Sequence, residues 1–261
     1  MTSLRRLLSM VLVLALTGPA SAATLVAEYQ FENNVADSTA NANNGTVRGA
    51  AISYVAGRFG SAAHFGGATA ISVPSSASLN MPSSYTIALW FRNAVGVDPT
   101  PVSNAQLLGK NGAASNRSYG MFLSGADELD AFFQPTADLN ARDITLPGVT
   151  FNDGLWHLFV TTYDAADGSQ RLYADGVVRV TQTLATGLTL INSTPALVIG
   201  AFSGALDGAS SFSSFYQGDL DDIRFYSGAL TGAEITALTL PDPSSLGLAL
   251  VGVAVALRRR R

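Results

Sequence analysis

Two acidic residues in the middle of the chain have the spacing of paired carboxylates on a β-strand. Glu128 and Asp130 alternate in the segment Glu-Leu-Asp-Ala-Phe-Phe, so both would point to one face of a strand. Glycosidic cleavage needs two positioned carboxylates in different protonation states. The residues that follow on the same strand, Phe132 and Phe133, are apolar, and no second Glu lies nearby. We therefore interpret the pair as a solvated strand end and expect no catalytic residue.

The two histidines do not predict a catalytic site either. A Ser-His-Asp triad needs an exposed histidine beside a nucleophile. His157 instead follows Trp156 in an apolar run, and the chain has no Gly-x-Ser-x-Gly segment. His157 is expected to be a packed, hydrogen-bonded core residue, and His64 is solitary. Since the chain has no cysteine, disulfides, thiolate metal sites and a cysteine nucleophile are excluded.

A second group of acidic and amide residues has the chemistry of a calcium site. The loop at residues 37–45 is dense in oxygen donors, which Ca²⁺ prefers. In strand parity Asp221 shares a face with Ile223 and Phe225, the expected core side, where a carboxylate needs a partner. A structural Ca²⁺ is one interpretation, and a loop held by its own backbone hydrogen bonds is the other. The candidate metal ligands are Asp37, Asn43, Gly45, Asp221 and Asp222.

Aromatic residues late in the chain are the candidates for binding a ligand. Phe212, Phe215 and Tyr216 lie in one predicted loop, where their rings could stack on a sugar. Packing at the edge of the fold is the alternative role. Trp90 and Trp156 each lie inside an apolar run, which favours core positions.

The charge balance limits the partners of the chain. Among 261 residues there are 15 basic and 19 acidic ones, but six of the arginines lie at the two ends. The part between the ends has nine basic residues against 19 acidic ones, a formal charge of −10. An acidic body of this kind is a poor polyanion binder, so nucleic acid is excluded as an expected partner.

The first 23 residues have the pattern of a secretory signal peptide. Two arginines precede an apolar run at residues 7–16, and Ala20-Ser21-Ala22 supplies a small-x-small cleavage sequence. The apolar run is too short to span a membrane. We therefore expect a signal peptide at residues 1–23 and secretion of the remaining chain.

The last 21 residues combine a proline motif, a short apolar segment and four arginines. As a helix, the apolar residues 246–257 would be about 18 Å long, shorter than the roughly 30 Å hydrocarbon core, so we expect only transient membrane association. Residues 241–261 resemble the PEP-CTERM sorting tail of Gram-negative bacteria, with Pro-Asp-Pro in place of Pro-Glu-Pro. The resemblance implies recognition by an exosortase, cleavage near the motif and a place at the cell surface.

The remaining residues, 24–240, are expected to form one domain made of short strands. Gly, Asn, Ser and Asp separate the β-rich runs, a spacing typical of an antiparallel sandwich. Asp175-Gly176 predicts a two-residue hairpin turn, and Thr231 with Glu234 predicts a capping box that opens a short helix at residues 233–238. The fold is predicted to be an all-β, two-sheet antiparallel jelly roll with one short C-terminal helix. The expected strands are 25–31, 70–73, 85–92, 119–123, 129–133, 155–163, 170–174, 177–183, 196–201 and 215–226.

The order of several segments resembles laminin-G-like domains. These segments are GLWHLFVTTYD (154–164), LYADG (172–176), LVIGAF (197–202), GDLDDIRFYSGALTGAEITAL (218–238), YQFENNVADSTANANNGTV (29–47) and AGRFGSAAHF (56–65). The resemblance implies the concanavalin A-like lectin/glucanase fold, with first and last strands side by side, which would bring the candidate calcium ligands together. Laminarinase-type hydrolases of this fold carry Glu-x-Asp-x-(x)-Glu on one strand, and here both places for the last acid are Phe.

These observations favour a secreted, surface-displayed binding module without catalysis. Its expected partners are an extracellular polysaccharide or a surface protein, with exopolysaccharide of the matrix as one candidate. Two other hypotheses stay open: a divergent glycan-cleaving enzyme of the same fold, and a structural matrix protein without a defined ligand. The sequence does not name the ligand, because this fold places recognition in variable loops.

Overall fold

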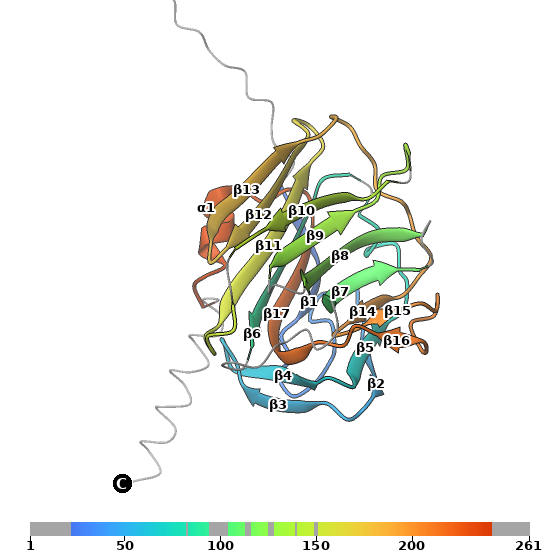
Figure 1. The fold of residues 1–261 in the computed structure, drawn as a ribbon, viewed down its shortest axis with the longest axis vertical. Coiled ribbons are helices and arrows are strands. Elements are labelled where there is room, and N and C mark those ends of the chain that lie inside the picture. The colour runs from blue at the N-terminus through green and yellow to red at the C-terminus, as the bar shows by residue number, and fades with distance from the viewer. Residues whose placement is uncertain are drawn as a thin grey trace, which may run out of the picture.

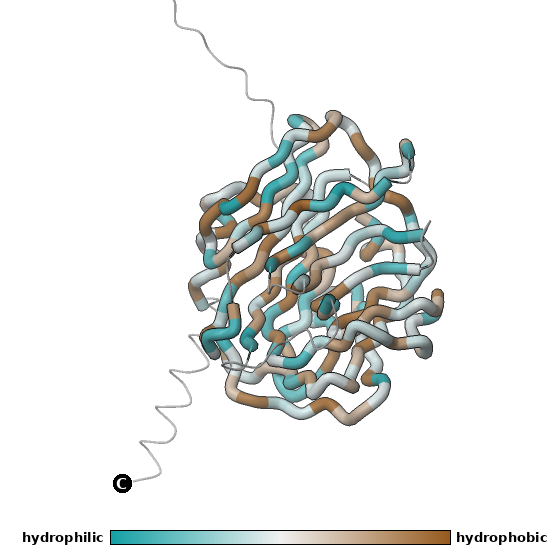
Figure 2. Tube along the Cα trace, in the orientation of Figure 1, coloured by the Kyte–Doolittle hydropathy of each residue, from teal (hydrophilic) through white to brown (hydrophobic). Residues whose placement is uncertain are grey.

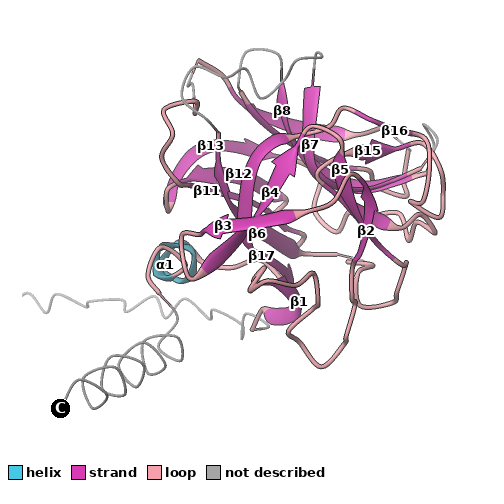
Figure 3. Cartoon of the chain, turned by 90° about the horizontal axis from the view of Figure 1, so that it is seen from below, coloured by secondary structure: helices cyan, strands magenta, loops and turns pink. Residues whose placement is uncertain are grey.

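A computed structural model describes residues 22–81, 83–93, 104–112, 116–124, 128–138, 140–148 and 151–241. In these ranges the chain forms two antiparallel sheets packed face to face, a small two-stranded sheet and one short helix (Figures 1 and 3). The all-β jelly roll expected from the sequence is confirmed. The signal peptide up to residue 21 and the tail beyond Pro241 lie outside the described residues. No helix within the described ranges is long and apolar enough to cross a membrane.

The first sheet has eight strands and contains both the first and the last strand of the described chain. Its order is β13-β12-β11-β6-β17-β4-β3, and β1 also pairs with β17. Thr24 lies opposite Ser227, so the first and last strands are side by side, as the family resemblance implied. The strands are β1 (Thr24–Tyr29), β3 (Ser53–Ala56), β4 (Ser61–Gly66), β6 (Tyr85–Arg92), β11 (His157–Asp164), β12 (Ser169–Ala174), β13 (Val177–Thr183) and β17 (Gln217–Ser227).

The second sheet has seven strands in the order β10-β9-β8-β7-β14-β5-β2. The small sheet pairs β15 (Phe202–Ser203) with β16 (Phe212–Ser213). In Figure 3 this small sheet and the helix lie on opposite sides of the molecule. The seven strands are β2 (Thr46–Gly49), β5 (Thr69–Val73), β7 (Asn104–Asn111), β8 (Arg117–Ser124), β9 (Leu129–Phe133), β10 (Arg142–Leu146) and β14 (Leu197–Ile199).

The main core lies between the two sheets. Alternate residues point inward from each strand, as in Ile87, Leu89 and Phe91 of β6 and Met121 and Leu123 of β8. Apolar and polar residues alternate along the strands accordingly (Figure 2). Burial of such side chains contributes about 1.5–3 kcal/mol each, and it fixes which residues remain on the outer faces.

The helix covers part of the outer face of the eight-stranded sheet, and a tight hairpin forms the edge of that sheet. Asp175 (φ 54°) and Gly176 (φ 78°) form the expected two-residue turn between β12 and β13. Helix α1 (Gly232–Ala237) begins after Thr231, which forms the expected capping box with Glu234. Ile235 of α1 is fully buried against a second cluster made of Ala88, Trp90, Leu158, Val160 and Tyr173. This outer face is therefore closed to a ligand along β6, β11 and β12.

A β-bulge in β17 places Asp221 on the opposite face of the strand from the one that the sequence predicted. The register with β6 shifts between Asp221 and Arg224, and Asp222 adopts a positive φ of 48°. Asp221 therefore lies opposite Trp90 on the outer face, while Ile223 and Phe225 point into the core. The expectation that all three share one face is wrong, because it assumed an unbroken two-residue repeat.

Candidate functional site

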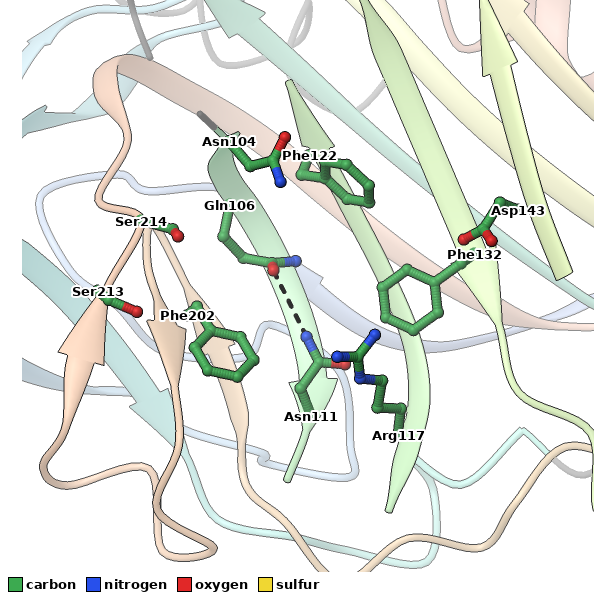
Figure 4. A pocket seen from close by; sticks show the side chains of 10 residues that line it. All are labelled: Asn104, Gln106, Asn111, Arg117, Phe122, Phe132, Asp143, Phe202, Ser213 and Ser214. Carbon is green, nitrogen blue, oxygen red and sulfur yellow. Dashed lines mark hydrogen bonds between the residues drawn. The ribbon is translucent and has the colours of Figure 1, made fainter. Parts of the chain in front are cut away.

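The outer face of the seven-stranded sheet carries a pocket of about 350 Å³. Figure 4 shows that its side chains come from β7, β8, β9 and β10 on one side and from the small β15–β16 sheet on the other. We call it the β7–β10 pocket. Its lining residues are Asn104, Gln106, Asn111, Arg117, Phe122, Phe132, Asp143, Phe202, Ser213 and Ser214.

Amide side chains of β7 form the floor of the pocket. The Nε2 of Gln106 donates to the carbonyls of Leu108 and, at 3.2 Å, of Met121. Its Oε1 therefore faces Asn111, whose Nδ2 lies 3.5 Å away (Figure 4). The backbone carbonyls thus fix the orientation of both amides, which determines where the floor offers donors and acceptors.

Two phenylalanines form an aromatic wall beside the amides. The rings of Phe122 and Phe132 have centroids 6.3 Å apart. Phe122 is partly exposed, whereas Phe132 is buried. Two glycines make room for the wall and the floor: a Cβ on Gly120 would lie 2.5 Å from Phe132, and one on Gly109 would lie 2.4 Å from Asn111. The sequence therefore keeps these positions free of side chains.

Charged groups stand at one end of the aromatic wall. The guanidinium carbon of Arg117 lies 5.9 Å from the centroid of the Phe132 ring. Asp143 lies opposite Phe132 in the β9–β10 register and is exposed. Desolvation by the neighbouring strands raises the pKa of Asp143, and the charge of Arg117 partly offsets this rise. The pocket thus combines amide, aromatic, cationic and anionic groups on a rigid sheet.

Asp130 lies on the same face as the pocket, two register positions away from the Asp143–Phe132 pair. It is 7% exposed and accepts a hydrogen bond from Thr145, opposite which it sits in β10. Burial raises its pKa, and hydrogen bonds from Thr145 and Ser124 oppose the rise. The expected solvated strand end is therefore wrong for Asp130, because β10, which the sequence did not predict, covers it.

The residues predicted to stack on a sugar lie outside the aromatic wall of the pocket and pack against neighbouring strands. Phe212 and Phe215 are partly buried, with centroids 6.2 Å apart, and pack against Ala70 and Val198 of β5 and β14. Tyr216 is fully buried, and its hydroxyl donates to Asn93 at 2.8 Å. Tyr216 therefore presents no ring to a ligand. Phe212 and Phe215 instead hold the small sheet whose neighbouring serines line the pocket.

The predicted calcium ligands of the opening loop are held by hydrogen bonds. Asp37 accepts from the backbone N–H groups of Glu28, Thr39 and Asn43 at 2.9–3.0 Å, and also from the side chains of Thr39 and Asn43. These bonds lower its pKa despite the opposing effect of desolvation. Asn43 is buried, with its carbonyl oxygen accepting from Tyr29, and the N–H of Gly45 donates to Val35. This arrangement is that of the second interpretation, a loop held by its own hydrogen bonds.

The two acids of β17 contact other segments. The Oδ2 of Asp221 accepts from the N–H of Phe59 at 3.0 Å, and its Oδ1 has no partner in the described ranges. Burial raises the pKa of Asp221 to about 7. Asp222 pairs with Arg224 at 3.0 Å. No group of three His, Asp or Glu side chains suited to a metal is found among the described residues, and calcium here stays a prediction.

The histidines and tryptophans occupy structural positions. His157 packs against Phe151, with ring centroids 4.9 Å apart, and contacts Asp153 and Asp175 at 3.1 Å each. It is the packed, hydrogen-bonded residue that the sequence predicted. His64 pairs with Asp219 at 2.7 Å but is 47% exposed. Trp90 is buried as expected, whereas Trp156 is half-buried and stacks on Arg92 at 4.7 Å.

Comparison with solved structures finds the same fold in several other proteins. Domain 4 of AbnA, a GH43 extracellular arabinanase from Geobacillus stearothermophilus in complex with arabinotriose, is 22% identical with a TM-score of 0.61, over 84% of this chain and 100% of that one. The binding domain of Paraclostridial Mosquitocidal Protein 1 is 17% identical with a TM-score of 0.64, over 82% of this chain and 51% of that one. Botulinum neurotoxin type C, whose cell entry depends on interaction with two ganglioside molecules, is 15% identical with a TM-score of 0.60, over 82% of this chain and 50% of that one.

These likenesses show the fold alone, because the identities are low. The chain spans about half the length of the two toxin structures. No curated protein matches the sequence. Residues 65–236, which include most of both sheets and α1, match the family described as the concanavalin A-like lectin/glucanases superfamily. The chain belongs to this superfamily.

Proposed function

We propose that this protein is a non-catalytic module that binds an extracellular polysaccharide through the β7–β10 pocket. The observation that carries the proposal is the juxtaposition of oriented amides, a partly exposed Phe122 and the charged pair Arg117 and Asp143 in one pocket (Figure 4). Sugars present hydroxyl groups at their edges and apolar C–H surfaces on their faces. Amide and charged groups suit the former, and an aromatic ring suits the latter.

Two of the similar structures support this class of ligand. One is a domain in complex with arabinotriose, and the other belongs to a toxin that interacts with gangliosides. A module of the present chain's size that binds a short stretch of a glycan would be consistent with both. The signal peptide and sorting tail expected from the sequence would place the module outside the cell, where exosortase would process it.

The carboxylates of this face favour binding over hydrolysis. Glycosidases need one carboxyl group kept protonated and another kept ionised, so their environments must shift the two pKa values apart. Asp130 and Asp143 are the acids nearest the pocket, and desolvation raises the pKa of both. Phe132 occupies the next outward place on β9 after Asp130, directly opposite Asp143. Both pKa values move in the same direction, which supports a binding role over a hydrolytic one.

The proposal is tested by screening the purified protein against a glycan array and measuring the hits by titration calorimetry. Phe122→Ala should weaken binding about tenfold, since an aromatic contact contributes about 0.5–1.5 kcal/mol beyond its buried area. Phe59→Ala is the matched control, because Phe59 packs on Trp90 at the outer face of the other sheet. Equal losses in both variants, or no binding by the wild-type protein, would contradict the proposal.

A further inference from the structure

Exposed apolar side chains gather at one end of the eight-stranded sheet. Among the described residues, five large apolar side chains are exposed, with exposed fractions between 48% and 65%. One of them, Leu206, lies in the loop between β15 and β16, across the molecule from α1 (Figure 3). The other four surround the point where the chain leaves the domain at Pro241, and we call them the exit rim: Leu155, Val177, Val178 and Leu240. Single exposed apolar residues are common, but a group of them at one place indicates an interaction surface.

The turn between β12 and β13 contacts the segment that follows α1. A Cβ on Gly176 would lie 2.9 Å from the side chain of Thr239. Val177 and Val178 come directly after the turn, and Leu240 comes directly after Thr239. Three members of the exit rim are therefore neighbours at the exit of the chain.

The residues before β11 form the other side of the exit rim. Asp175, in the same turn, accepts a hydrogen bond from the backbone N–H of Leu158 at 3.0 Å and contacts His157 at 3.1 Å. Leu155 and Trp156 come directly before these two residues. Trp156 is half-buried and packs against the same outer cluster as α1. An exposed leucine and an amphipathic ring thus lie beside the turn.

Two exposed arginines accompany the apolar side chains. Arg58 donates to the carbonyl of Thr239 at 3.2 Å, and Arg179 lies close enough to Asp175 for its charge to lower the pKa of that carboxyl. Tryptophan and arginine suit the boundary between lipid and water, where the apolar part of each side chain is buried and the polar end reaches the headgroups. Because Asp153 also lies here and the whole body is acidic, a lipid without net charge is favoured over an anionic one.

The sequence that follows the rim would hold it close to a membrane. Residues 246–257 contain only Gly, Ala, Val and Leu. At full extension the residues that join them to Pro241 reach at most about 18 Å. A bilayer that receives this apolar segment therefore lies next to the exit rim, and the segment by itself is too short to span it.

We propose that the exit rim lies in the headgroup layer of the membrane that receives the apolar tail, with Trp156 and the two arginines at the boundary with water. The rim adds apolar contact to a segment that anchors only marginally, so the domain stays on the membrane while the tail is intact and is held weakly once the tail is removed. This contact is independent of glycan binding, because the β7–β10 pocket opens on the outer face of the other sheet.

Tryptophan fluorescence tests the placement of the rim. The secreted chain with its tail intact is mixed with phosphatidylcholine vesicles whose acyl chains carry bromine, a quencher, near the headgroups. The chain has two tryptophans, and Trp90 is buried, so quenching reports on Trp156. We expect the vesicle-bound protein to lose Trp156 emission, and Trp156→Phe to bind without such a loss. Binding without quenching, quenching that persists in Trp156→Phe, or no binding to the vesicles would each overturn the inference.

Two leucine variants test the contribution of the rim to affinity. Leu155→Ser should weaken partitioning into the vesicles at least about threefold, because less apolar surface leaves water on binding. Leu206→Ser is the matched control, since it makes the same change at a similarly exposed position away from the rim and should leave partitioning unchanged. Equal partitioning of both variants, with unchanged melting curves, contradicts the inference. Self-association without lipid that Leu155→Ser abolishes would assign the rim to a second copy of the chain and contradict it as well.

Discussion

Gly120 lies directly opposite Phe132 in the β8–β9 register, and the phenylalanine ring fills the space that a side chain on the glycine would need. A Cβ at position 120 would lie 2.5 Å from the ring. The wall of the pocket thus depends on a missing side chain in the neighbouring strand.

Gly120→Ala should consequently destabilise the protein and weaken glycan binding. Overpacking of this kind costs about 1–3 kcal/mol, and each kcal/mol lowers the melting temperature of a domain of this size by about 2–4 °C. Gly66→Ala is the control, since a Cβ there meets nothing within 4 Å. Calorimetric melts and sugar titrations that match the wild type would show that Phe132 moves freely.

His157 should make the stability of the protein depend on pH. Desolvation acts to lower its pKa, but the hydrogen bonds and charges of Asp175 and Asp153 outweigh this and raise it. A histidine with a raised pKa in the folded state contributes fully below its ordinary pKa of about 6.5, and the contribution is lost as the pH rises through the folded value. The pKa of Asp175 is lowered, so the contribution of its charge to stability is lost only at acidic pH.

Asp175→Asn should therefore lower the melting temperature more at pH values near 6 than near 9. The effect is small, at most about 1 kcal/mol, because Asp175 is half exposed. Asparagine keeps the acceptor for the N–H of Leu158 and tolerates the positive φ of this turn. The exposed pair of Asp167 with Arg171 provides Asp167→Asn as a control without a histidine. Equal shifts at both pH values would rule out His157 as the origin.

Asp221 should reduce stability at neutral pH unless a cation neutralises it. Burial raises its pKa to about 7, so the folded state binds a proton that the unfolded state has released. Stability should then fall as the pH rises from about 4 to about 7. Asp221→Asn, which keeps an acceptor for the N–H of Phe59, should be the more stable protein at pH 8 by up to about 4 kcal/mol, and the difference should vanish near pH 4.

The same variant tests calcium. With Ca²⁺ bound at Asp221 the difference between the two proteins narrows: the wild type gains about 2.7 kcal/mol at a hundredfold excess over the dissociation constant, and a chelator removes the gain. Melts of both proteins with calcium and with chelator decide between the two outcomes. Without bound calcium, each protein's two curves superimpose.

Hydrolysis of a bound glycan is not expected. The wild-type protein should release no reducing ends from any polysaccharide that it binds, and replacing Glu128 and Asp130 by Ala should leave that result unchanged. Reducing-end release that the double variant abolishes would identify these acids as catalytic and contradict the proposed role.

Processing of the tail is a prediction of the sequence alone. Mass spectrometry of the protein released from the cell surface should find a C-terminus near residues 241–245, because the proline motif precedes an apolar segment that is too short for a stable anchor. Surface material that retains Arg261 would contradict exosortase processing.

The sequence predicted the elements that local chemistry determines. The Asp175-Gly176 turn and the Thr231 cap follow from residue types at fixed spacing. It did not predict β7, whose outward side carries amides and whose Lys110 is buried, bonded to Ser75 and Ser193. A strand with polar residues on both faces has no two-residue hydrophobic repeat, and in this chain that strand forms the floor of the candidate site.

Two further features could not be predicted without the tertiary structure: which residues of β17 point into the core, and where the late aromatic residues pack. Asp222 lies in the β-bulge of β17 and has a positive φ, which no local sequence pattern predicted. Phe212 and Phe215 were predicted in a loop as sugar-stacking candidates, but they pack against β5 and β14, which is the edge packing that the sequence left as their alternative role. Their neighbours Ser213 and Ser214 line the pocket instead.

The packing of α1 on one sheet gives the molecule a front and a back. The chain leaves the domain at Pro241, just after this helix, while the β7–β10 pocket opens on the outer face of the other sheet. A support that holds the protein by its C-terminal end would thus contact one face, and the glycan would dock on the opposite one. Attachment and capture need not compete for space, so a layer of such molecules could present every pocket outward at once.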